Sequence, residues 1–126
     1  MAESIEQGDL RGKRPIARVK LAQFSWASGA TDAVSKDLPF TGMMRQFVTV
    51  VNDNTANRTA TVAILDGDDY ELYSLAAIPE NATTVTTLSS STEVCVPQGC
   101  TVKVTPSGDP GASGMTVDVT FMGYNP

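Results

Sequence analysis

The chain has 126 residues, enough for one domain with one hydrophobic core. It contains no histidine, which excludes Ser-His-Asp and Cys-His catalysis and removes the commonest metal ligand. Its net charge of −5 argues against sequence-general binding to nucleic-acid phosphates. No apolar run approaches the roughly 18 residues that a membrane-spanning helix needs. Residues 1–8 are mostly acidic or polar and do not form a secretory signal, so we expect a soluble chain made in the cytoplasm.

Residues 1–14 hold two sizeable apolar side chains among charges and glycines. Such a segment buries too little surface to offset its ordering entropy, so alone it should be mobile. Two interpretations stay open: a frayed terminus, or an arm that becomes ordered on a neighbouring subunit. In the second, the apolar pair anchors the arm and three basic residues face an acidic surface. The predicted partner-binding residues of the arm are Ile5, Leu10, Arg11, Lys13 and Arg14.

Pro15 marks the entry to the first predicted strand, Ile16 to about Trp26. The alternation of apolar and polar residues, which has the period of two of a half-buried strand, changes phase before Phe24. Such a change indicates a β-bulge. Beyond the next turn, residues 33–37 are expected to form a helical turn.

A strand follows from about Met44 to Asn52, apolar on both sides, which is typical of the central strand of a sheet. The next strand, 58–65, alternates so that Ala60, Val62 and Ile64 point inward.

Asp66-Gly67-Asp68-Asp69 is the strongest turn signal in the chain and predicts a hairpin with a strand over Tyr70–Leu75. Three carboxylates so close together could also bind calcium. Calcium needs six to eight oxygens, however, and this run lacks the spaced ligands and terminal Glu of the known helical calcium loop. The plain turn is the preferred interpretation, and we expect no metal site and no cofactor.

A Thr-rich strand is expected at 83–88. Strands at 94–96 and 101–105, on either side of Pro97-Gln98-Gly99, predict a second hairpin. A loop rich in Gly and Pro, 106–114, then leads to the final strand.

The final strand, Met115 to Tyr124, places Val117, Val119 and Phe121 on one face. About eight strands at spacings of about 8 to 14 residues, without a long helix, are typical of an antiparallel sandwich. The predicted fold is all-β: one antiparallel β-sandwich over 15–126, Greek-key and immunoglobulin-like or jelly-roll-like, behind an extended N-terminal arm over 1–14.

Cys95 and Cys100 flank the second predicted hairpin. They could form a disulfide if their side chains face each other, whereas in a chain made in the cytoplasm they are more often reduced thiols. Both states stay open. Two thiols cannot hold zinc without further Cys or His ligands.

Met43 and Met44, just ahead of the central strand, are either core residues or a soft contact patch for a partner. The larger aromatic residues either pack in the core and rim or form a sugar-stacking platform. These residues are Trp26, Tyr70, Tyr73 and Tyr124.

Three stretches carry a resemblance to a known class of proteins: RTATVAILDGDD (58–69), AIPENATTV (77–85) and GCTVKVTPSG (99–108). Through them the chain resembles small structural proteins of tailed bacteriophage particles. The resemblance implies a β-sandwich capsid decoration (cement) protein on the exterior of the virion. It also implies a homo-oligomer, trimer or dimer, that bridges neighbouring major capsid proteins.

Cement adds contacts that hold the shell against internal DNA pressure, which calls for a rigid body plus extensions that reach neighbours. The expected function is therefore non-enzymatic, without direct contact to nucleic acid or membrane. A head fibre or tail protein is the nearest alternative, and a carbohydrate-binding or adhesin module is another. An enzyme is the least expected class, because no charged or nucleophilic cluster appears where the strands would bring its members together.

Overall fold

The structure is a computed structural model that describes residues 16–88 and 93–124. These residues form ten strands and no helix, which confirms the all-β prediction. The strands are β1 (Ile16–Lys20), β2 (Phe24–Trp26), β3 (Val34–Asp37), β4 (Gly42–Val51), β5 (Ala60–Leu65), β6 (Glu71–Ile78), β7 (Ala82–Thr87), β8 (Val94–Val96), β9 (Thr101–Pro106) and β10 (Met115–Tyr124).

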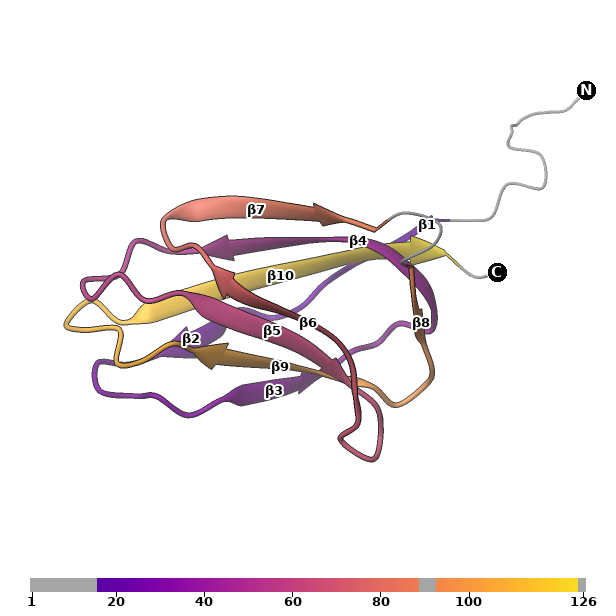
Figure 1. Cartoon of the computed structure of the whole chain (residues 1–126), viewed down its shortest axis with the longest axis horizontal. Coiled ribbons are helices and arrows are strands. Elements are labelled where there is room, and N and C mark those ends of the chain that lie inside the picture. Colours follow the sequence, from indigo (N-terminus) through magenta and orange to yellow (C-terminus); the bar gives the residue numbers. More distant parts are fainter. Residues whose placement is uncertain (1–15, 89–92, 125–126) are drawn as a thin grey trace, which may run out of the picture.

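The strands make two antiparallel sheets that pack face to face (Figure 1). The six-stranded sheet has the order β1-β10-β4-β7, with β2 also on β10 and β8 also on β4. The four-stranded sheet has the order β3-β9-β5-β6. β4 is paired on both sides, as expected for the central strand.

The strand pairs are nested around one hairpin. The chain doubles back between β5 and β6, after which β7 pairs with β4, β9 pairs with β3, and β10 pairs with β1 and β2. A long hairpin rolled up in this way is a jelly roll, one of the sandwich types expected. The count exceeds eight because the first predicted strand is interrupted into β1 and β2, and because β3 forms where no strand was expected.

The interruption between β1 and β2 is the irregularity that the sequence pattern predicts. Lys20 faces Thr120 and Phe24 faces Val117, so the β1–β2 side holds one more residue than β10 over the same interval. An extra residue on one strand is the defining feature of a bulge. It restores Phe24 and Trp26 to the buried side.

Two local predictions are wrong. Residues 34–37 form β3 instead of a helical turn, because they pair along β9 and so complete the edge of the four-stranded sheet. Residues 94–96 and 101–105 do not form a hairpin. β8 pairs with β4 and β9 pairs with β3 and β5, so the turn at 97–100 carries the chain from one sheet to the other.

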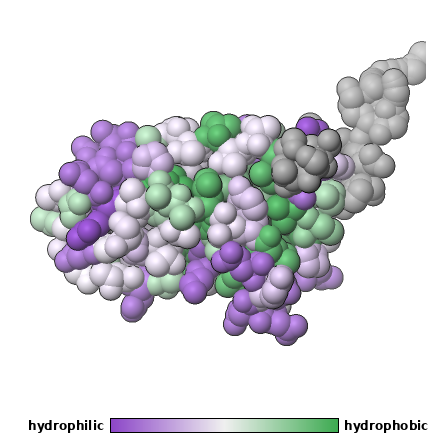
Figure 2. Space-filling view, in the orientation of Figure 1, coloured by the Kyte–Doolittle hydropathy of each residue, from purple (hydrophilic) through white to green (hydrophobic). Residues whose placement is uncertain are grey.

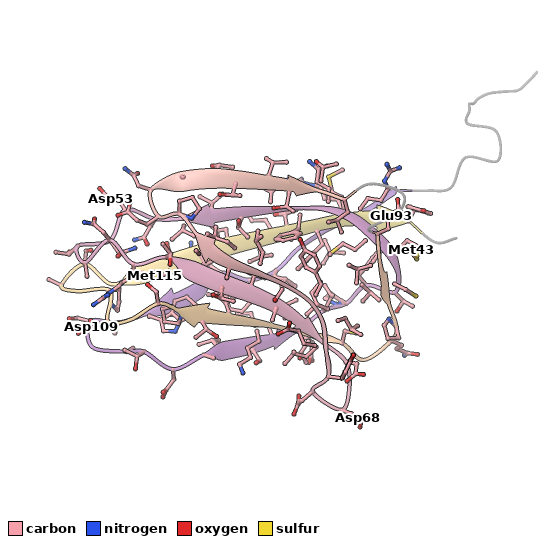
Figure 3. All side chains as sticks on the ribbon, in the orientation of Figure 1. Met43, Asp53, Asp68, Glu93, Asp109 and Met115 are labelled. Atoms are coloured by element: carbon pink, nitrogen blue, oxygen red, sulfur yellow. The ribbon has the colours of Figure 1, made fainter. Side chains whose placement is uncertain are left out.

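The core lies between the sheets and is filled by the alternating positions. Val117, Val119 and Phe121 of β10 are at most 1% exposed, and Ala60, Val62 and Ile64 of β5 are also buried, as predicted. Burial of each large apolar side chain contributes about 1.5–3 kcal/mol relative to exposure. Met115 is also buried, whereas of the acidic residues labelled in Figure 3, Asp53 and Asp109 lie at one end of the sandwich and Glu93 at the other.

Candidate interaction surface

The outer faces of the two sheets differ in chemistry. Cross-strand pairing on the six-stranded sheet builds three rows that run from β7 across β4 to β10, two of them reaching β1. We call this surface the outer β4 face. Its rows are Thr87–Gln46–Met122–Arg18, Val85–Val48–Thr120–Lys20 and Thr83–Val50–Asp118.

Aliphatic side chains on β4 and β7 of the outer β4 face are open to solvent. Val85 is 55% exposed and Val50 is 38% exposed; the third large hydrophobic exposed among the described residues is Tyr70, at the β5–β6 turn. A shallow hollow of about 320 Å³ lies between β1, β10 and β4, and a second of about 210 Å³ shares Met122 with it.

Positive charge flanks these aliphatic side chains although the chain as a whole is acidic. Arg18 and Lys20 line the larger hollow, and Arg45, whose guanidinium pairs with the carboxylate of Glu93, lines the smaller one. Asp118 is the one carboxylate among the described lining residues, and it accepts a 3.2 Å hydrogen bond from the side-chain amide of Gln23. The face therefore suits a partner surface that is partly apolar and acidic.

The outer side of the four-stranded sheet is polar by comparison. Its strands present hydroxyl groups and charges to solvent, and the exposed strand residues there include Ser35, Asp37, Ser74 and Lys103. In the view of Figure 2, hydrophilic residues gather at one end of the sandwich and around the β5–β6 turn, and hydrophobic residues lie along its middle.

The predicted partner-binding residues fall into two groups. Ile5, Leu10, Arg11, Lys13 and Arg14 lie outside the described residues. Met44 is fully buried, so it is a core residue and is not available as a contact, which corrects one of the two interpretations open for it. Met43 is half-buried and pairs with Cys95 and Tyr124.

Sequence reasoning missed the outer β4 face. The sequence of β4 is apolar on both sides, as is typical of a central strand, whereas the structure buries only the inner set of its residues. The missed residues are Arg18, Lys20, Val48, Val50, Val85 and Met122. The signal present in the sequence is the single valine in the Thr-rich strand, Val85. It indicates an apolar surface only once β7 is known to pair with β4.

The aromatic residues do not form a sugar-stacking platform in this structure. Trp26 is 5% exposed, and its indole nitrogen donates a 2.7 Å hydrogen bond to the carbonyl oxygen of Asp32. Tyr73 packs edge-on against Phe47 with 5.7 Å between ring centroids. Tyr70 remains exposed.

The acidic hairpin is a plain turn held by its own first residue. The Asp66 carboxylate accepts the backbone amides of Asp68 at 2.9 Å and Tyr70 at 2.8 Å, and Asp69 adopts a φ of 62°. Both are established preferences of Asp in turns. Within the described residues no group of three or more His, Cys, Asp or Glu side chains could hold a metal ion.

Cys95 and Cys100 are free thiols in this structure. Cys95 is exposed on β8, and Cys100 is buried at the crossing between the sheets. Burial raises the pKa of the Cys100 thiol, with smaller contributions in the same direction from Asp66 and Cys95. Of the two states left open by the sequence, the structure has the reduced one.

One carboxylate ties together the loops at the end of the sandwich that is labelled by Asp53 and Asp109 in Figure 3. Asp109 Oδ1 accepts the backbone amides of Gly111 and Gly29, both at 2.9 Å, and its own carbonyl accepts Arg58 Nε at 2.9 Å. The amides of Gly111 and, to a smaller extent, Gly29 lower the pKa of the Asp109 carboxyl, and the charge of Arg58 acts in the same direction. All of these hydrogen bonds are internal, so this end is a structural cap.

No protein-family model matches the chain, and no curated protein sequence matches it. Among the described residues no helix is long and apolar enough to cross a membrane. Within the described part of the chain, the outer β4 face combines exposed aliphatic side chains, two hollows and basic residues on one surface.

Proposed function

We propose that this chain is a non-enzymatic structural protein of a tailed-phage particle. It binds the outside of the head as a decoration (cement) protein and bridges neighbouring major capsid proteins. The observation that supports this most is the outer β4 face, where exposed aliphatic side chains are flanked by basic ones on a rigid sheet. Its partner is an acidic, partly apolar surface of the capsid protein.

The fold supports the same proposal by analogy. Jelly rolls recur in viral capsid and lectin domains, although a fold by itself does not fix a function. A fully packed body with internally bonded loops is suited to adding contacts without changing shape. Residues 1–14, which lie outside the described residues, would extend the contact to a neighbouring subunit through Ile5 and Leu10.

The first test measures binding to heads assembled without this protein. The purified chain is mixed with such heads, and the bound fraction is measured by co-sedimentation. Lys20→Glu reverses a charge on the outer β4 face and should weaken binding at least about tenfold, because it places a carboxylate against an acidic partner. Lys103→Glu makes the same change on the polar sheet and serves as the matched control.

Equal effects of the two charge reversals would count against the outer β4 face. No co-sedimentation of the wild-type chain would count against the decoration function itself. Attachment confined to tails in labelled micrographs would transfer the chain to the related tail proteins.

A second test addresses the N-terminal arm. Deleting residues 1–12 should abolish binding to heads while the thermal unfolding of the β-sandwich stays unchanged. Unchanged binding by the shortened chain would remove the arm from the proposal and leave the outer β4 face.

A further inference from the structure

Among residues 16–88 and 93–124, each sheet ends in edge strands whose backbone groups are open to further pairing, and most of these edges are protected. β1 carries Arg18 and Lys20, and β3 carries Lys36 and Asp37. β6 begins at Glu71, and its pairing with β5 shifts register twice. β2 and β8 have only three residues each. Charge, irregular register and shortness all discourage pairing with another strand.

β7 has none of these protections. Its six residues, ATTVTT, include no charge, no proline and no glycine, and they consist mainly of strand-favouring Thr and Val. β7 pairs with β4 along its whole length without a register shift. In the described part of the chain it is the last strand on its side of the sheet (Figure 1).

The backbone groups of alternate β7 residues point away from β4. The amide of Leu88, just beyond β7, donates to the carbonyl of Arg45 at 2.6 Å. Because the direction of hydrogen bonding alternates along an antiparallel strand, Thr83, Val85 and Thr87 direct their amides and carbonyls to the open side. The side chains of these same three residues are exposed.

We propose that β7 pairs with β7 of a second copy of this chain, antiparallel and about a two-fold axis at Val85. The two six-stranded sheets then become one continuous sheet. Val85 faces its symmetry mate, and Thr83 faces Thr87 on each side. The pairing forms about six backbone hydrogen bonds, two at each facing pair.

The absence of charge on β7 favours a second copy of this chain as the partner that pairs with its open edge. A two-fold axis pairs a strand with the same strand of the second copy, so a charged residue near the axis faces a residue of the same charge. The same pairing through β1 would bring Arg18 and Lys20 against the same cations of the other copy. β7 is neutral throughout, and its pairing covers Val85, which is 55% exposed in the single chain.

This self-association goes beyond the proposed function, since a single chain can bind a capsid without it. The test is the mass of the full chain in solution, measured by sedimentation velocity over a range of concentrations. The wild-type chain should form a dimer. Val85→Lys and Val85→Glu should each weaken it at least about tenfold, because like charges then face each other across the axis.

An equimolar mixture of the two Val85 variants should restore the dimer, because opposite charges then meet. Ser35→Lys adds the same charge to an exposed position on β3 and should leave the dimer unchanged. Amide exchange gives a second measurement that needs no variant. The amides of Thr83, Val85 and Thr87 should gain protection as concentration rises, whereas that of Thr84 should be protected throughout.

Four outcomes would overturn the proposal: a wild-type chain that is monomeric up to millimolar concentration, a trimer, a dimer that survives both charge variants, or no change in the exchange of the three amides. Loss of the dimer on removing residues 1–15 alone, with the Val85 variants unaffected, would identify the N-terminal segment as the contact instead.

Discussion

Tyr124, the last residue of β10, donates a 2.6 Å hydrogen bond from its hydroxyl to Oε1 of Glu93. The other carboxylate oxygen of Glu93 accepts Arg45 Nε at 2.9 Å. The side chain of Glu93 is 6% exposed, whereas that of Arg45 is 54% exposed. One buried carboxylate thus joins the residue before β8 to both β4 and β10, at the end of the sandwich where Figure 3 labels Glu93.

Removing this carboxylate should cost far more stability than removing its exposed partner. Glu93→Ala deprives both donors of their acceptor and should lower the free energy of unfolding by about 2–3 kcal/mol. Arg45→Gln should lower it by less than about 1 kcal/mol, because water replaces much of a half-exposed ion pair. Urea denaturation of the two variants measures the difference, and equal losses would contradict it.

The alternation in the sequence predicts strands and their buried sides, and it does so best where one face meets solvent. β10 and β5 were predicted because burial of one face fixes which residues alternate. The prediction of a hairpin around Pro97 was wrong because alternation identifies a strand but not the strand with which it pairs. Alternation says that 94–96 and 101–105 are strands, but their partners, β4 on one side and β3 and β5 on the other, lie far away in the sequence.

The candidate surface was harder to predict than the core. Val48 and Val50 are indistinguishable from core residues in the sequence, because they lie in an apolar run. Their neighbours Val85 and Lys20 come from strands that are distant in the chain. A surface of this kind exists only after β1, β10, β4 and β7 have assembled, so no local pattern encodes it.

The Asp109 carboxylate should make stability depend on pH in acid. Its pKa lies below the ordinary 3.8, through the amides of Gly111 and Gly29 and the charge of Arg58, against a weaker opposing effect of desolvation. A lowered folded pKa means that the stabilisation is present above 3.8 and is lost as pH falls through the folded value. Asp109→Ala should therefore lower the unfolding midpoint most above 3.8, and its profile should converge with that of the wild type below. A difference between the two unfolding midpoints that stays constant down to strongly acidic pH would contradict the assignment of this pH dependence to Asp109.

The two thiols should differ strongly in reactivity. Cys95 is exposed and Cys100 is buried with a raised pKa, so at about pH 8 iodoacetamide should modify one thiol rapidly and the other only on unfolding. Cys95→Ser should abolish the fast phase, whereas Cys100→Ser should keep it. Mass spectrometry of the native and denatured chain counts the modified thiols. Two thiols that resist modification even in denaturant would indicate the disulfide instead.

Gly123 should tolerate no side chain, because two strands approach closely at the register shift between β10 and β4. A Cβ built there would collide with the carbonyl oxygen of Met43 and lie 2.5 Å from Cζ of Phe40. The carbonyl belongs to strand backbone and cannot rotate away, so Gly123→Ala should lower the free energy of unfolding by about 1–3 kcal/mol. Gly67→Ala is the matched control, since its Cβ would have only the carbonyl oxygen of Gly99 within reach, at 4.0 Å, and should change stability by less than about 0.5 kcal/mol. Thermal and urea unfolding measure both variants. Similar stabilities for the two would mean that β10 and β4 separate more easily at this point than their close approach indicates.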